Sequence, residues 1–74
     1  MPDQTKLDYA RRHVADAEAH VRHQAELVAQ LERDGHDTAG AWDLLKTFEE
    51  TLAAHKEHLA LLEHQARLAS DHQE

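Results

Sequence analysis

The segment Glu32-Arg33-Asp34-Gly35-His36-Asp37-Thr38 separates two long stretches that carry apolar residues at helical spacing, and it decides the fold. Gly35 suits the left-handed conformation that ends many helices, because it lacks the Cβ atom that penalises positive φ. Asp37 or Thr38 then caps the following helix through a side-chain oxygen. The sequence therefore predicts two helices joined by one turn.

Both stretches have the seven-residue apolar period of a coiled coil. Before the turn, the a positions are Leu7, Val14, Val21 and Val28, and the d positions are Ala10, Ala17, Gln24 and Leu31. After it, the a positions are Leu45, Leu52, Leu59 and Ala66, and the d positions are Ala41, Phe48, His55, Leu62 and Ala69. We predict a single all-α domain over residues 1–74, with helices at about 5–34 and 38–71 and the turn at 35–37. Thr5 or Asp3 caps the first helix.

A turn this short makes the helices pack as antiparallel neighbours in a coiled-coil-like hairpin. Conventional layers of a and d positions then place Val28 against Phe48 and Val21 against His55. The same register brings Val14 to Leu62.

The hairpin has little to bury by itself. The chain has 74 residues, no Cys to form disulfides, and a single Phe, Trp and Tyr. Further apolar residues flank the seam, so we predict that a second copy covers them and that two hairpins form a four-helix bundle. The predicted interface residues are Leu27, Leu31, Trp42, Leu44, Phe48 and Leu61. The alternatives are a hairpin with exposed leucines, or one that docks on a different protein.

The charge balance disfavours nucleic acid as a partner. Fifteen acidic residues against 8 basic ones give a net charge of −7, and the basic residues are scattered, whereas phosphate binding needs a basic patch. The sequence has no apolar run of membrane-spanning length and no signal-peptide core. We therefore expect a cytoplasmic protein with no membrane partner.

Eight histidines stand out in a chain of this length: His13, His20, His23, His36, His55, His58, His64 and His72. His20 and His58 occupy g positions, which face each other in an antiparallel pair, and His55 occupies a d position. The predicted register thus gathers His20, His55 and His58, with Gln24 close by, into a polar layer halfway along the hairpin.

Three interpretations of this layer remain open. His55 and Gln24 are core polar residues that set register and partner choice at some cost in stability. Alternatively, His20, His55 and His58 bind a divalent transition metal such as zinc, nickel or copper. In the third interpretation, protonation of His55 and His58 loosens the bundle near pH 6.

Catalysis has little support in the sequence. No phosphate-binding loop is present, and the carboxylates fall mostly where a solvated helix carries charge in any case. We predict no enzymatic activity and no required cofactor.

The Gly35-His36-Asp37-Thr38 turn and the pattern Leu44-Leu45-Lys46-Thr47-Phe48-Glu49-Glu50 resemble a group of short bacterial helical-hairpin proteins, met especially in alphaproteobacteria. The likeness also includes the pair His55 and His58, and it covers most of the chain. It implies one folding unit in a bacterial cytoplasm, and it transfers no catalytic residue. Sequence alone thus predicts a homodimeric, non-enzymatic adaptor or regulator that acts through helix–helix contacts. The alternative function is a histidine-rich bundle that binds metal or responds to pH.

Overall fold

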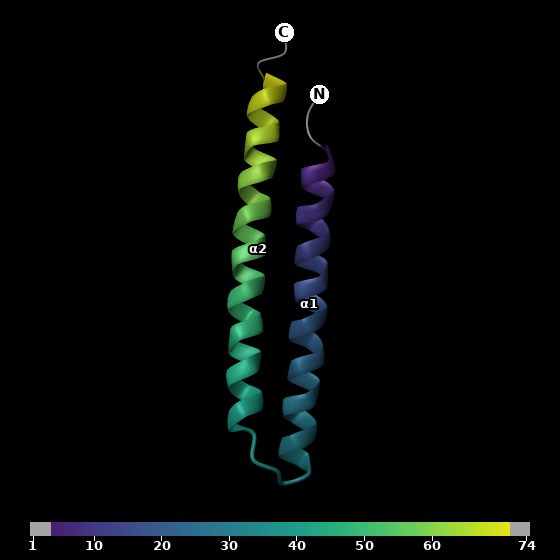
Figure 1. The fold of residues 1–74 in the computed structure, drawn as a ribbon, viewed down its shortest axis with the longest axis vertical. Coiled ribbons are helices and arrows are strands. Elements are labelled where there is room, and N and C mark those ends of the chain that lie inside the picture. Colours follow the sequence, from purple (N-terminus) through teal and green to yellow (C-terminus); the bar gives the residue numbers. More distant parts are fainter. Residues whose placement is uncertain (1–3, 72–74) are drawn as a thin grey trace.

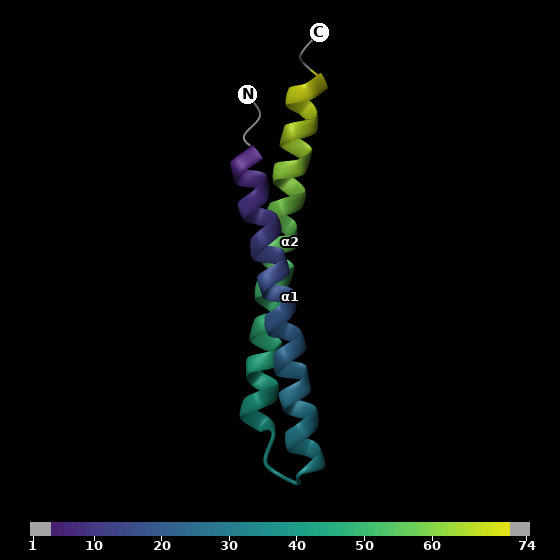
Figure 2. The same ribbon diagram turned by 90° about the vertical axis from the view of Figure 1, so that its right-hand side faces the viewer.

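The chain folds into two antiparallel helices, which confirms the predicted all-α hairpin. The computed structural model describes residues 4–71, with α1 at Gln4–Arg33 and α2 at Ala39–Asp71. Figures 1 and 2 show the helices side by side along their lengths, and α2 reaches past the start of α1 at the open end of the hairpin. The molecule is a rod whose Cα atoms span 62 × 14 × 12 Å.

Two backbone hydrogen bonds that differ from the regular helical pattern close the end of α1. The amide of His36 donates to the carbonyl of Leu31 at 2.9 Å, and the amide of Gly35 donates to that of Glu32 at 3.2 Å. Gly35 follows the residue that caps α1, and its φ of 76° is the left-handed conformation that this kind of helix end requires. The predicted role of Gly35 is therefore confirmed.

Asp37 and Thr38 share the start of α2. The carbonyl of Thr38 accepts the first helical hydrogen bond, from the amide of Trp42 at 2.9 Å. The Asp37 carboxylate accepts one from the amide of Ala39 at 3.0 Å, satisfying one of the free N–H groups at the helix start. At the other helix, α1 already begins at Gln4, so Thr5 lies inside the first turn. The alternative cap, Asp3, lies outside the described residues.

The predicted seam is where the core lies. The buried apolar side chains are Leu7, Ala10, Ala17, Val28 and Leu45, and every one of them occupies an a or d position. Most other seam residues are half-buried, including Val14, Val21, Phe48 and Leu59. Two helices cannot enclose their own seam, because each covers only one side of its partner.

The predicted register is wrong by about one heptad. His55 stacks on His13, with ring centroids 5.2 Å apart, and Phe48 lies against His20 at 5.5 Å. Each residue of α2 thus faces a residue about seven positions earlier in α1 than predicted. The reason is the turn: the chain folds back at Gly35 and returns directly, so that α2 starts beside the last turn of α1 rather than beyond it.

Gln24 holds this register from inside the seam. Its side chain is 7% exposed, and its Nε2 donates to the carbonyl of Ala41 at 2.9 Å, in the first turn of α2. A buried amide needs a hydrogen-bond partner, and sliding the helices by one turn would remove this one. The geometry is the one required by the first interpretation of Gln24, as a polar core residue that selects a register.

Candidate interaction surface

The two long sides of the hairpin differ in chemistry. His13 and His58, both at g positions, border one groove, so the g positions of both helices lie on one side. Arg11 and Glu63, both at e positions, form an ion pair at 3.9 Å on the other side. We call the first side, made of the c and g positions of both helices, the histidine-rich face. The second side, made of the b and e positions, is the charged face.

Formal charge is concentrated on the charged face. It carries Asp8, Arg11, Glu18, Arg22, Glu32, Lys46, Glu49, Lys56, Glu63 and Arg67. Among the described helical residues, the histidine-rich face has only two formally charged side chains, Lys6 and Asp16. It carries instead the imidazoles of His13, His20, His23 and His58. Removing this face from water therefore desolvates far fewer charges than removing the opposite face.

The exposed apolar side chains also gather on the histidine-rich face. Tyr9 is 58% exposed, Leu27 and Leu44 44% each, Leu61 52% and Leu68 47%, and all of them occupy c or g positions. Trp42, 49% exposed, lies on the charged face instead. Of the other predicted interface residues, Leu31 and Phe48 are half-buried at the seam. The predicted interface is thus divided among two faces and the seam.

The histidines are arranged differently from the predicted layer. His20 lies against the ring of Phe48, tilted by 30°, and is not the neighbour of His55. The half-buried His55 stacks nearly parallel, at 9°, on His13. The structure therefore brings His13, and not His20, to the pair His55 and His58. This difference is a direct consequence of the register, because the g position opposite His58 moves back by one heptad.

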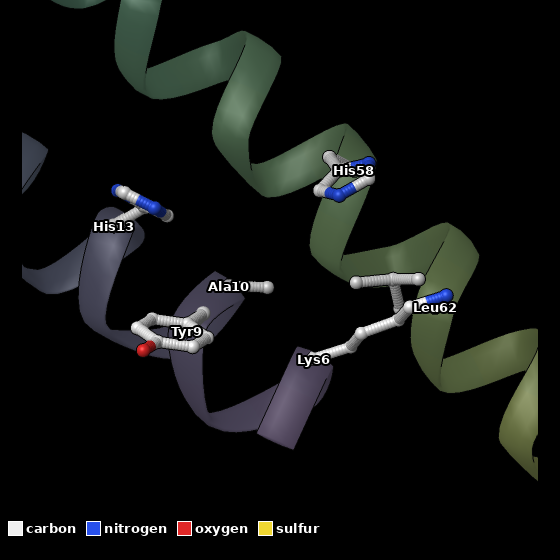
Figure 3. A pocket seen from close by; sticks show the side chains of 6 residues that line it. All are labelled: Lys6, Tyr9, Ala10, His13, His58 and Leu62. Carbon is white, nitrogen blue, oxygen red and sulfur yellow. The ribbon is translucent and has the colours of Figure 1, made fainter. Parts of the chain in front are cut away.

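A groove of about 320 Å³ crosses the histidine-rich face toward the open end of the hairpin. Figure 3 shows its walls: Lys6, Tyr9, Ala10 and His13 come from α1, and His58 and Leu62 come from α2. The floor is low because Ala10 has only a methyl group to fill the space between the helices. Tyr9 forms the outer edge, and the Arg12 guanidinium lies 6.0 Å from the centre of its ring. The groove is mainly apolar in its lining and lacks a carboxylate among these six residues.

Metal ligands are not assembled within residues 4–71 of one chain. Among residues 4–71, no group of three His, Asp or Glu side chains is placed to hold a metal ion. His13 and His55 stack on each other, and two imidazoles leave half of a tetrahedral zinc shell unfilled. In this register His20 does not share a site with His55 and His58, and the metal site of His20, His55 and His58 stays a prediction.

Comparison with known proteins adds no relative. No family model matches the chain, and neither a curated protein nor a solved structure does so. The likeness to short bacterial hairpin proteins consequently remains a prediction from sequence motifs. In the described part of the chain, neither helix is long and apolar enough to cross a membrane.

Sequence reasoning missed the groove and the role of His13 in it. Both depend on which g positions face each other, and the heptad pattern is compatible with more than one register. The signal that selects the register is Gln24, a lone amide in an otherwise apolar part of the seam. The hydrogen bond from Gln24 to the carbonyl of Ala41 identifies the observed alignment only once the helices are placed side by side.

Proposed function

We propose that this chain is a non-enzymatic protein that acts through helix–helix contacts, and that two copies pair into a four-helix bundle. The observation that carries the proposal is the area of the isolated hairpin. Its accessible surface is 5759 Å², whereas a compact monomer of its 8.4 kDa mass has about 4,600 Å². The excess, about 1,150 Å², is larger than the roughly 800 Å² that one partner contributes to a stable protein–protein interface.

The composition of the exposed surface supports the same proposal. Leu27, Leu44 and Leu61 are each roughly half exposed on one side of a long rod. Isolated exposed leucines are ordinary, but several along one face, beside half-buried seam residues, form the kind of surface that marks a contact site. In a four-helix bundle these residues and the open side of the seam become core.

The dimer would serve as a small adaptor or regulator in this proposal. With the histidine-rich faces packed together, the charged faces lie outside and remain available to another protein. Trp42 is the exposed aromatic residue on that outer side, and aromatic residues are over-represented in interface centres. Partner searches should therefore use the dimer and its charged face as bait.

Solution mass tests this proposal. Multi-angle light scattering on a sizing column at pH 8 should give about twice the 8.4 kDa of one chain at micromolar concentration. A folded monomer at every concentration up to about 1 mM, the weak limit for a specific contact, would rule out the dimer. The exposed leucines would then be free for a different protein.

The contact between His13 and His55 favours one alternative function, histidine-based binding of a transition metal. Neutral imidazole nitrogens are good ligands for zinc, nickel and copper. Calorimetric titration with zinc and nickel tests the alternative, with His13→Gln and His55→Gln combined as the disrupting variant. The matched control is His20→Gln, because His20 packs on Phe48 instead. Heat signals that are the same in both variants would exclude the pair as ligands.

A further inference from the structure

We propose that the second copy packs on the histidine-rich face in the antiparallel direction, with the turns of the two hairpins at opposite ends of the dimer. Leu27 and Leu44 of each copy then sit over the groove lined by Ala10, His13 and His58 of the other. This inference rests on the proposed dimer and specifies its face and its topology.

The choice of face follows from the cost of desolvation. Burying the histidine-rich face removes Lys6 and Asp16 from water, together with neutral or titratable groups. Burying the charged face would remove ten formally charged side chains from water, and the ion pairs among them, Arg11 with Asp8 at 3.7 Å and with Glu63 at 3.9 Å, are long and exposed. A buried charge without close partners is strongly unfavourable. The exposed leucines lie on the histidine-rich face, whose burial removes fewer charges from water.

The choice of direction follows from shape. The turn end of the face carries Leu27 and Leu44, one from each helix, and the open end carries Tyr9, Leu61 and Leu68. The groove of about 320 Å³ lies at the open end of the same face. A parallel pair would place leucines on leucines and groove on groove, leaving the groove unfilled. An antiparallel pair places Leu27 and Leu44 of each copy over the groove of the other, and close packing favours the arrangement that fills the groove.

A two-fold axis makes this arrangement consistent along both helices. When two such faces meet antiparallel, α1 lies over the second copy's α1, and α2 over its α2. On α2, an axis that passes Thr51 brings Leu44 of one copy to His58 of the other, because Thr51 is midway between them. Thr51 is also at a g position. On α1, the corresponding axis brings Leu27 to the second copy's Tyr9.

The same axis brings the carboxylate of the face to a histidine. Asp16 and His20 are placed symmetrically about the point on α1 that also relates Tyr9 to Leu27. Each Asp16 therefore meets His20 of the second copy, where an imidazole N–H can donate to the carboxylate. In a parallel pair α1 would instead lie over the second copy's α2, and Asp16 would have no such partner.

Engineered disulfides test the face and the direction together. The chain has no Cys, so each variant carries a single thiol. Thr51→Cys should form a covalent dimer on mild oxidation, since its two copies meet at the axis within the 4.4–6.8 Å Cα separation that a disulfide needs. A refolded mixture of Leu44→Cys and His58→Cys should form the mixed disulfide for the same reason. Both should react about tenfold or more faster than Lys56→Cys, an exposed residue of the charged face.

Each other outcome overturns the inference. A mixed disulfide between Leu27→Cys and Leu44→Cys chains would indicate the parallel arrangement, because only there does α1 lie over the second copy's α2. Preferential reaction of Lys56→Cys would place the contact on the charged face. Slow reaction of every variant, with circular dichroism showing intact helices and light scattering showing a dimer, would refute the inference alone. A monomeric mass would refute the proposed dimer as well.

Discussion

Substituting Leu44 by Gln should weaken the dimer. The expected loss of binding free energy follows from the fraction of the Leu44 side chain that is exposed in the single hairpin. Fully burying a Leu side chain is worth about 1.5–3 kcal/mol, and Leu44 is 44% exposed in the single hairpin. Covering the remainder in the dimer therefore contributes about 0.7–1.3 kcal/mol per copy by the same scale. Two-fold symmetry doubles this to about 1.3–2.6 kcal/mol, which raises the dimer dissociation constant by about 10- to 80-fold.

The matched control is Trp42→Gln. Trp42 is 49% exposed and lies two residues away on the same helix, but on the charged face. Glutamine is a good helix former, so neither substitution should disturb α2 itself. Sedimentation equilibrium on both variants gives the two dissociation constants. The reasoning is refuted if Trp42→Gln weakens the dimer and Leu44→Gln leaves it unchanged.

Four further substitutions test stability. Val28→Asp should abolish the cooperative thermal transition seen by circular dichroism, because Val28 is 2% exposed and the carboxylate would have no partner there; an unchanged melt would contradict the observed seam. Gly35→Ala should lower the free energy of unfolding by about 1–2 kcal/mol, since Gly35 has φ 76° although no atom lies within 4 Å of the added methyl group. Gly40→Ala, equally open but helical, should raise it by about 1 kcal/mol, and urea denaturation that gives both changes the same sign would refute this account. Gln24→Ala should cost about 0.5–1.5 kcal/mol through loss of the hydrogen bond to Ala41, and a denaturation midpoint equal to that of the parent chain would show that this bond contributes nothing.

The sequence was sufficient to predict local structure because local structure depends on neighbours in the chain. Gly35 is the residue at which a positive φ is needed, and Asp37 has the oxygen that an N–H at the start of α2 requires. The heptads identified every side chain that is buried among residues 4–71, since helical period alone determines which residues share a face. These features are read from adjacent positions without knowing how the helices meet.

The groove could not be predicted in the same way, because it joins residues from two helices. Lys6 and Leu62 line one hollow only in the observed register. In the predicted register, shifted by a heptad, the same a and d residues would still have formed a seam. The apolar pattern repeats every seven residues, so it distinguishes poorly between alignments that differ by seven.

Sequence by itself determined that this protein is a hairpin of two long amphipathic helices, because helix propensity, apolar period and turn chemistry all act within a few residues of one another. Tertiary structure decided the alignment of α1 with α2, and with it the stacking of His13 on His55 and the division of the surface into two chemically different faces. The physical reason is the path of the turn and the need of the buried Gln24 amide for the carbonyl of Ala41. Both are relations across the hairpin, which the order of residues along one helix does not contain.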